Sequence, residues 1–409
     1  MSYKYLKSED IENKTVLLRV DFNEEVDEKG CLVDDFRIQA ILPTLEFLKK
    51  HHAKIIILSH AGRPEGEWLE KFSLKPMAEC LSKHLGVKFV QTEDKAEDYP
   101  IDHVVFVHGN IEKAKTQKAV KAMQSKDIIV LENLRFYKGE EEESEDFAKI
   151  LASLGDVYVD DAFAVAHHGS ASTVTIAKLL PSFVGPLLEK EIKNLDYILT
   201  KAKKPFVLMM GGIKISDKSK TLERLGKIAD HILVGGGLAN VFFAAQGLEI
   251  GESIVEKESQ QLAWKILQNY KDKLILPKDV AVFDTTHPSE VAIIKDHYQI
   301  KSTEKICDIG PKTILEYATI LKTAKTICWN GPVGYFEKKP FRTGTMALAR
   351  IIGGVSKGRA FGLVGGGETV AAVRQAHQGE YIDHISTGGG AMLEYLAGNE
   401  LPGLKALQK

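Results

Sequence analysis

The sequence has few cysteines, no long apolar run and almost no excess of either charge. Its 409 residues contain four cysteines without any Cys-x-x-Cys spacing, which disfavours a disulfide scaffold and a thiolate zinc site. The first residues, MSYKYLKSED, lack the apolar core of a signal peptide, and no run approaches the roughly 18 apolar residues of a membrane span. The net charge of −2 gives no bulk attraction for a polyanion. These absences predict a cytoplasmic protein that binds neither membranes nor nucleic acid.

Short apolar runs and amphipathic stretches alternate along the whole sequence. Thirteen runs have the length and composition of strands: 15–20, 54–58, 87–90, 103–107, 127–131, 156–159, 206–210, 231–235, 274–277, 280–283, 326–329, 360–364 and 381–385. Helical patterns lie between or after them, among others at 37–50, 73–84, 144–153, 217–227, 257–270, 342–352 and 367–376. Strands that alternate with helices of this length predict parallel sheets covered by helices.

Thirteen strands are too many for one open sheet of ordinary size, so the sequence predicts an α/β fold with two doubly wound, Rossmann-like domains joined by a hinge helix. The segment PSFVGP at 181–186 marks the division, and a helical pattern follows it. An ordinary surface helix is the alternative. We expect a first domain at 1–180, a hinge segment and interdomain helix at 181–200, and a second domain at 201–390. The acidic run Glu140 to Glu143 is expected to be a solvated face.

Glycine clusters follow several strands of the second half. They lie at 211–212, 235–237, 365–367 and 388–390, and most of them directly precede a helical stretch. Glycine lets the backbone approach a phosphate closely, and a helix N-terminus directs free N–H groups toward it. Tight strand–helix turns also use glycine, but four clusters in one domain favour a phosphate pocket. Neither the P-loop motif nor the G-x-G-x-x-G fingerprint is present.

The first half instead has cationic side chains after its strands. Only four arginines occur in the first 200 residues, against 22 lysines. Arg37, Arg63 and Arg135 follow an apolar run or open the helix after it, and Arg19 lies inside a strand. Guanidinium groups bind carboxylate and phosphate oxygens in a bidentate manner. Individual ion pairs are the alternative, but three such arginines favour an anion pocket, to which histidines after strands could contribute: His60, His167 and His168.

Two lysines, Lys214 and Lys218, lie four residues apart beyond the strand at 206–210 and at the start of a helical pattern. Lysines are unfavourable near a helix N-terminus, so a bound anion would explain them; two solvated lysines are the alternative. An anion pocket, a glycine-rich phosphate pocket and these lysines suit phosphoryl transfer between a nucleotide and a small acid. The sequence has no serine nucleophile elbow and no H-E-x-x-H motif.

These residues lie in segments that resemble the phosphoglycerate kinase family, and the resemblance covers essentially the whole sequence. The matching segments are RVDFN (19–23), DDFRI (34–38), SHAGRP (59–64), LENLRF (131–136), VDDAFAVAH (159–167), LLEKE (187–191), GGIKISDK (211–218), GGGLANVF (235–242), DIGPKT (308–313), WNGPVGYFE (329–337), VGGGET (364–369) and ISTGGGAMLEYL (385–396).

The resemblance implies reversible, in-line transfer of the acyl phosphate of 1,3-bisphosphoglycerate to ADP after domain closure, giving 3-phosphoglycerate and ATP with Mg²⁺, in glycolysis and gluconeogenesis. It also implies a monomer whose segment 391–409 returns to the first domain. The residues that it assigns to the phosphoglycerate are Asp21, Asn23, Arg37, His60, Arg63, Arg135 and His168. Those that it assigns to the nucleotide are Gly212, Lys214, Lys218, Gly235, Gly236, Gly237, Asn330, Pro332, Glu337, Gly366, Gly367, Glu368 and Thr369. Catalysis is assigned to Arg37, Lys214, Lys218, Gly366 and Gly389, and the metal to Glu368.

Several positions depart from the family pattern. His168 and Ser170 stand where the family usually has arginine and histidine, Glu368 replaces an aspartate, and Ile213 replaces an alanine and could crowd the neighbouring loop. Glu24 and Glu25 replace an apolar residue and a proline. These changes leave two alternatives to an active kinase: a binding or regulatory protein that has lost turnover, and a kinase for a different acyl phosphate. The retained arginines and lysines favour activity, and the intact SHAGRP and DDFRI segments favour phosphoglycerate.

Overall fold

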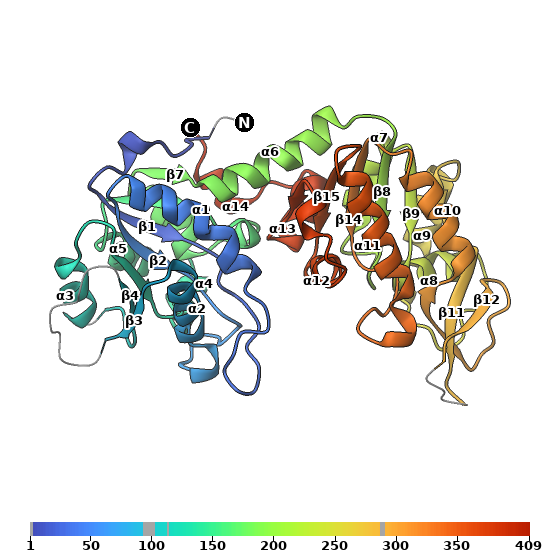
Figure 1. The fold of residues 1–409 in the computed structure, drawn as a ribbon, viewed down its shortest axis with the longest axis horizontal. Helices are drawn as coiled ribbons and strands as arrows, with labels where there is room; N and C mark the ends of the chain where they lie inside the picture. The colour runs from blue at the N-terminus through green and yellow to red at the C-terminus, as the bar shows by residue number, and fades with distance from the viewer. Residues whose placement is uncertain (1–2, 93–102, 113, 287–290) are drawn as a thin grey trace. The chain divides into compact units, whose positions relative to one another are not determined.

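The computed structural model describes residues 3–92, 103–112, 114–286 and 291–409. Its contacts divide the chain into two compact units, Met1–Ile192 with Glu400–Lys409 and Lys193–Asn399 (Figure 1). Each unit is built around its own parallel sheet, so the expected α/β fold with two parallel-sheet domains is confirmed.

The first unit has a seven-stranded parallel sheet in the order β3-β4-β5-β2-β1-β6-β7. Its strands are β1 Thr15–Arg19, β2 Lys54–Leu58, β3 Lys88–Gln91, β4 His103–Val107, β5 Ile128–Leu131, β6 Val157–Asp160 and β7 Ser182–Val184. Its helices are α1 Phe36–Lys50, α2 Lys75–Leu85, α3 Ala114–Ala122, α4 Lys138–Glu141, α5 Glu145–Ala152 and α14 Pro402–Ala406. The central strands are buried along almost their whole length, which explains their unbroken apolar sequences.

The second unit has a six-stranded parallel sheet in the order β10-β9-β8-β14-β15-β16. Its strands are β8 Phe206–Met210, β9 His231–Val234, β10 Leu274–Ile275, β14 Thr326–Asn330, β15 Phe361–Gly365 and β16 His384–Ile385. Helix α6 Pro186–Lys201 runs through the unit boundary, and the others are α7 Ser219–Ile228, α8 Gly236–Ala245, α9 Gln260–Asn269, α10 Pro311–Leu321, α11 Thr343–Ser356, α12 Gly367–Gln375 and α13 Gly389–Ala397. No helix in the described ranges is long and apolar enough to cross a membrane.

The prediction of parallel pairing throughout is wrong for one part of the second unit. The run at 280–283 belongs to β11 Asp279–Asp284, which pairs antiparallel with β12 Ile293–Asp296 and β13 Glu304–Ile309 in a separate sheet. Only residues 285–292 separate β11 from β12, too few for the crossover that a parallel pair needs. The two partner strands carry charged residues, which hid them from a search for apolar runs.

Two boundaries also differ from the predicted ones. Residues 182–184, predicted to be part of the hinge, form β7 and pair with β6. Residues 391–399, predicted to return to the first domain, belong to the second unit, because α13 packs against α7 and Leu393 O accepts a hydrogen bond from Thr221 Oγ1 at 2.7 Å. Residues 400–409 do join the first unit, where Tyr3 and Gln408 form an antiparallel bridge.

A buried carboxyl group, Asp161, joins three elements of the first unit just after β6. Its Oδ2 accepts a hydrogen bond from Thr44 Oγ1 of α1 at 2.5 Å, and its Oδ1 accepts one from the Leu188 amide of α6 at 2.8 Å. Burial raises the pKa of Asp161 to about 7, although both hydrogen bonds act to lower it. The group therefore exchanges a proton near neutral pH while it connects α1 to α6.

Replacing Asp161 with asparagine should change how stability depends on pH. The unfolded carboxyl titrates near 3.8 and the folded one near 7, so between these values the folded state binds the extra proton. The contribution of Asp161 to the free energy of unfolding is therefore fully present below about pH 4 and is lost as pH rises through 7. Relative to the wild type, Asp161→Asn should gain about 2–3 kcal/mol in unfolding free energy between pH 5 and pH 8, measured by urea denaturation. Asp156→Asn, at the other end of β6, is the control, and an equal difference at both pH values would contradict this assignment.

Candidate active site

Four neighbouring strands of the first sheet, β5, β2, β1 and β6, end at the same edge. Because parallel strands end together, the segments that follow them lie side by side. Arg37 lies in the first turn of α1. The segments after the strands carry the other residues predicted for the anion pocket: Asp21, Asn23, His60, Arg63, Arg135 and His168. The structure thus brings together residues from widely separated parts of the first half of the sequence.

Arg37 is held in place by the loop that follows β1. Its Nη1 donates to Asp21 Oδ2 at 2.8 Å and to the Asn23 carbonyl at 2.7 Å. The Asn23 side chain in turn accepts a hydrogen bond from the Gly62 amide at 2.8 Å, which connects the loop after β1 with the loop after β2. The guanidinium is about a quarter exposed, so its remaining N–H donors can bind an anion.

His60 is buried among cations. Its Nδ1 lies 3.3 Å from Arg19 Nη2 and 4.0 Å from Asp21 Oδ1. Burial lowers the pKa of His60 well below its usual range, and the charges of Arg19, Arg135, Arg37 and His168 lower it further. His60 is therefore neutral at physiological pH and can offer a hydrogen bond without adding a charge.

The acidic run after β5 is not entirely solvated, contrary to the prediction. Glu140 is only 2% exposed, and its carboxylate accepts hydrogen bonds from the Ser172 hydroxyl at 2.6 Å and from the Ser172 amide at 3.0 Å. The same hydroxyl accepts one from Arg19 Nε at 2.8 Å. Glu140 thus balances the buried Arg19, an arrangement that the local sequence does not indicate because Ser172 lies 32 residues away.

The remaining cations lie closer to solvent. Arg135 Nη1 donates to the Gly62 carbonyl at 2.7 Å, and its Nε lies 3.2 Å from Glu141 Oε1. Burial lowers the pKa of the Arg135 guanidinium, and Arg63 acts in the same direction. Arg63 and His168 are exposed, and the His168 ring centroid lies 3.9 Å from that of His167. This edge of the first unit therefore offers several cations to an anion from solvent.

In the second unit the glycine clusters also lie at neighbouring strand ends. The strands β9, β8, β14, β15 and β16 are adjacent in the sheet, and the four clusters follow four of them. Three of these glycines have left-handed backbone angles, Gly212 with φ +85°, Gly236 with φ +64° and Gly366 with φ +96°. A Cβ at Gly236 would lie 2.8 Å from the Pro332 carbonyl oxygen, so only glycine fits there. The glycines therefore let the loops after β8, β9 and β14 touch one another.

These loops border a cavity of about 970 Å³ within the second unit. Its walls include backbone from the glycine loops and apolar side chains, which is the usual character of a site for a flat organic group. Among the residues predicted for the nucleotide, those that line it are Gly212, Gly236, Gly237, Pro332, Glu337 and Glu368. Ile213 also lines it and is about half exposed, so the isoleucine is not buried in the adjoining loop.

Lys218 lies at the start of α7, with its ammonium against the loop after β8. A Cβ built at Gly212 would lie 2.7 Å from Lys218 Nζ. Burial lowers the pKa of Lys218, whereas the negative charges of Glu368 and Asp217 raise it. Lys214, four residues earlier, is exposed. The Glu256 carboxylate fixes the loop between them by accepting hydrogen bonds from the amides of Ile215 at 3.0 Å and Ser216 at 3.1 Å.

The start of α12 packs against two other glycine loops. Asn330 is buried, and its Nδ2 donates to the Gly365 carbonyl at 3.0 Å, while Thr369 Oγ1 accepts from the Gly331 amide at 2.7 Å. Gly366 has a φ of +96° and precedes the helix. A Cβ at Gly389 would lie 2.6 Å from Gly366 Cα. Glu368 in the first turn of α12 is exposed, so its carboxylate is free to bind a cation.

Sequence reasoning missed a buried carboxyl group beside this cavity, that of Asp308 near the end of β13. Its carboxyl accepts hydrogen bonds from the Gly344 amide at 2.7 Å and from the Ile309 amide at 2.9 Å. Burial raises its pKa to about 7. A Cβ at Gly334 would lie 2.1 Å from Asp308 Oδ1, so the group shapes the wall formed by the loop after β14. Asp308 is the first residue of the family segment DIGPKT, but it was not selected because no strand was predicted before it.

Comparison with known proteins agrees with this geometry. The family model described as phosphoglycerate kinase matches residues 6–399. The chain belongs to the phosphoglycerate kinase family. It is 41% identical to the phosphoglycerate kinase of Chloroflexus aggregans, over 100% of this chain and 99% of that one, and 42% identical to that of Desulforudis audaxviator, over 100% of both. The chain is therefore a kinase, a phosphotransferase with phosphoglycerate kinase function in glycolysis.

Solved phosphoglycerate kinases have the same fold. The structure of the enzyme from Pyrococcus horikoshii is 33% identical, with a TM-score of 0.82 and coverage of 98% of both chains. That from Coxiella burnetii is 38% identical, with a TM-score of 0.78 and coverage of 97% of this chain and 96% of that one.

The structure explains one departure from the family pattern, the glutamate at position 24. Glu24 Oε1 accepts a hydrogen bond from the Arg37 amide at 2.7 Å and thus caps the first turn of α1.

Proposed function

We propose that the first unit binds the phosphoglycerate and the second unit binds the nucleotide. The observation that carries this assignment is the set of arginines at one edge of the first sheet, together with the neutral, buried His60. Arg37, Arg63 and Arg135 match the carboxylate and phosphate of a small acid with two anionic groups. Asp21 and Asn23 orient Arg37, and His60 and His168 complete the pocket.

In the second unit, the glycine loops and Pro332 border the flat base and the sugar, and Glu337 lies at the sugar side. The helix that starts at Gly367 directs free amides toward phosphates, with Gly366, Thr369 and Asn330 supporting its first turn. The exposed Glu368 carboxylate suits Mg²⁺, which takes one or two carboxylates together with substrate phosphates. When bound, Mg²⁺ neutralises charge on the nucleotide phosphates.

In the transfer itself, an oxygen of the terminal ADP phosphate attacks the phosphorus of the acyl phosphate, and the carboxylate of 3-phosphoglycerate leaves. No covalent enzyme intermediate is needed, so the residues act by position and charge. We assign Lys218, Lys214 and Arg37 to the charge on the group in transfer, and the backbone at Gly366 and Gly389 to holding the phosphates. The partly buried Lys218 is the best suited, because its charge is poorly screened by water.

A coupled assay with 3-phosphoglycerate and ATP tests this function directly. We expect turnover that requires both substrates and Mg²⁺. Binding of both ligands without turnover would instead support a binding or regulatory protein. Turnover with another carboxylic acid, together with no measurable affinity for 3-phosphoglycerate, would support a kinase for a different acyl phosphate.

Direct transfer requires the two substrates to meet, so we propose that α6, which runs through the unit boundary, acts as a hinge helix. Small-angle X-ray scattering should then give a smaller radius of gyration with 3-phosphoglycerate and a non-hydrolysable ATP analogue together than with either ligand alone. A radius that is the same in all ligand states would contradict closure.

The proposal also includes a monomeric enzyme in the cytoplasm. Four free cysteines, one of them exposed, suit a reducing compartment. Sedimentation equilibrium of the full chain would test the monomer, since a mass near 45.3 kDa is expected.

The glycine at position 236 provides a sharp test of the nucleotide pocket. In Gly236→Ala, the new methyl group would meet the Pro332 carbonyl at 2.8 Å and Gly212 at 3.1 Å, so the loops must move apart. We expect the Kd for ADP to rise about tenfold or more, measured by isothermal titration calorimetry. Gly247→Ala is the matched control, because Gly247 follows the same helix with a φ of +77° but has nothing within 4 Å of its Cβ position. If both variants raise the Kd for ADP equally, backbone strain alone would explain the loss of affinity, and the contact with Pro332 would not.

A further inference from the structure

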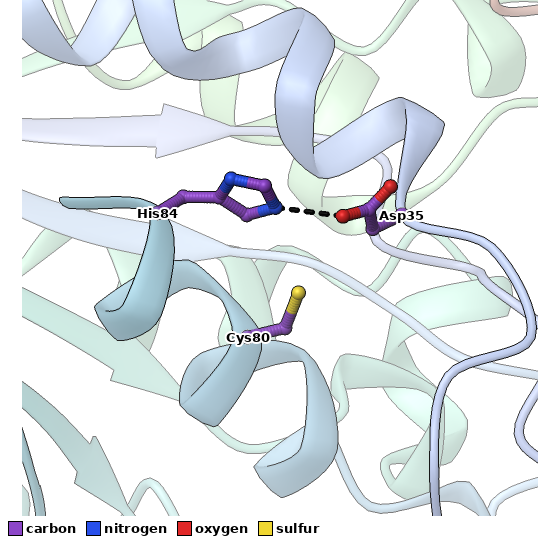
Figure 2. A group of neighbouring side chains, drawn as sticks. All are labelled: Asp35, Cys80 and His84. Carbon is purple, nitrogen blue, oxygen red and sulfur yellow. Dashed lines mark hydrogen bonds and ion pairs between the residues drawn. The ribbon is translucent and has the colours of Figure 1, made fainter. Parts of the chain in front are cut away.

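Outside the proposed active site, one group of side chains in the first unit has the composition of a metal site. Asp35 precedes α1, while Cys80 and His84 lie one turn apart on α2. Their ligand atoms, a carboxylate oxygen, Sγ and an imidazole nitrogen, all lie within 4.8 Å of one another. Figure 2 shows the Cys80 sulfur pointing toward the bond between His84 and Asp35. Three different donors, one from the residue before α1 and two from α2, therefore lie close together.

The present contacts within this group leave room for a ligand. His84 Nε2 lies 2.7 Å from Asp35 Oδ2, and the other carboxylate oxygen accepts a hydrogen bond from Gln39 Nε2 at 2.7 Å. That second contact fixes the carboxylate as a metal-bound carboxylate is usually fixed. The Cys80 thiol has no hydrogen-bond partner among the described residues, although it is half-buried at the edge of the core. Cys80 packs against the core and also places its Sγ beside the His84–Asp35 pair, so a third donor is available at the same point.

We propose that Asp35, Cys80 and His84 bind a zinc-class divalent ion between α1 and α2. Thiolate and imidazole ligands select such ions over Mg²⁺ and Ca²⁺, which prefer oxygen ligands. Three protein ligands leave a fourth position for water, and His84 is exposed, so solvent can reach it. The search for Cys-x-x-Cys motifs missed this group, because its one cysteine lies near a histidine four residues later and near the carboxylate of Asp35, which is 45 residues earlier and directly precedes α1.

The geometry requires only small movements. Bonds of about 2.0–2.3 Å place the donors of a tetrahedral zinc ion about 3.3–3.5 Å apart. The His84–Asp35 distance of 2.7 Å must lengthen, and the two distances to the Cys80 sulfur, each at most 4.8 Å, must reach the same range, which side-chain rotation can supply. On binding, the thiol loses its proton to solvent, and His84 binds as the neutral tautomer with its proton on Nδ1. Burial and the nearby carboxylates of Asp35 and Glu24 raise the pKa of the Cys80 thiol, whereas Lys83 lowers it, so a metal must displace this proton.

The experiment uses Co²⁺ as a spectroscopic probe with the full chain, after removal of metals by a chelator and in excess Mg²⁺ to occupy oxygen-rich sites. We expect a thiolate-to-cobalt charge-transfer absorption that saturates at one Co²⁺ per chain and is displaced by Zn²⁺. Cys80→Ser should abolish the absorption. Asp35→Asn and His84→Asn should weaken the apparent Kd about 10- to 100-fold. Cys31→Ser, which removes the exposed cysteine, is the matched control and should bind as the wild type does.

A second measurement guards against misfolding of the variants. Without metal, Cys80→Ser should have the circular dichroism spectrum and Tm of the wild type. Addition of Zn²⁺ at about 100 times the Kd should raise the Tm of the wild type by roughly 5 °C and leave that of Cys80→Ser unchanged. The proposal is overturned if the wild type shows no thiolate absorption, if the absorption persists in Cys80→Ser, or if it disappears in Cys31→Ser.

Discussion

Lys218→Ala should lower kcat by about 100-fold or more while the Kd for nucleotide changes less than tenfold. The ammonium lies against the loop after β8, where a Cβ at Gly212 would come within 2.7 Å of it, and the residue is partly buried. A partly buried ammonium group is screened less by water than an exposed one. It therefore stabilises the negative charge on the transferred group more strongly. The loss should therefore appear mainly in the chemical step, as measured by steady-state kinetics with a separate binding titration.

The structure indicates why this variant should still fold. The Lys218 amide donates to the Ile215 carbonyl at 3.0 Å, and its carbonyl accepts from the Leu222 amide at 2.8 Å; alanine keeps both bonds. Lys220→Ala is the matched control, because Lys220 lies two residues later on the same helix and is exposed. Near-normal turnover in Lys218→Ala would remove this residue from the mechanism. An equal loss in Lys220→Ala would point to a general effect of charge.

Arg37→Ala should lower kcat/KM for 3-phosphoglycerate by about 10²- to 10³-fold and leave the KM for ATP within about twofold. The change removes a cation and also leaves the Asp21 carboxylate, now 2.8 Å from Arg37 Nη1, without its partner. That unpaired negative charge would repel the substrate, so both effects act in the same direction. Steady-state kinetics with each substrate varied in turn would measure the difference.

Two further variants separate these contributions. The double variant Asp21→Asn with Arg37→Ala removes the repelling carboxylate, so any recovery of kcat/KM measures that part of the loss. Lys50→Ala, at the exposed far end of the same helix, removes a cation without touching the pocket and should behave as the wild type does. If Arg37→Ala keeps kcat/KM within threefold of the wild type, Arg37 does not contact the substrate.

The sequence predicted the layout of the fold because the relevant signals are local. A buried parallel strand needs an unbroken apolar run, and the central strands of both sheets have one, as in Lys54–Leu58 and Phe206–Met210. Ligand-binding residues often follow such strands, so Arg37, His60 and the glycine clusters could be proposed as site residues from their position alone. The order of the strands was not available from the sequence, and it is this order that makes the loops after β5, β2, β1 and β6 neighbours.

What only the tertiary structure decided depends on partners that are distant in the chain. Glu140 looks like one of four solvated glutamates until Ser172 and Arg19 surround it. The strand β13 carries charged residues, and only its pairing with β11, which no local period shows, identifies it as a strand. Asp35, Cys80 and His84 come together because α1 packs against α2. Local sequence determines which residues can form a strand or a turn, but burial, pairing and ligand geometry follow from where the remote parts of the chain meet.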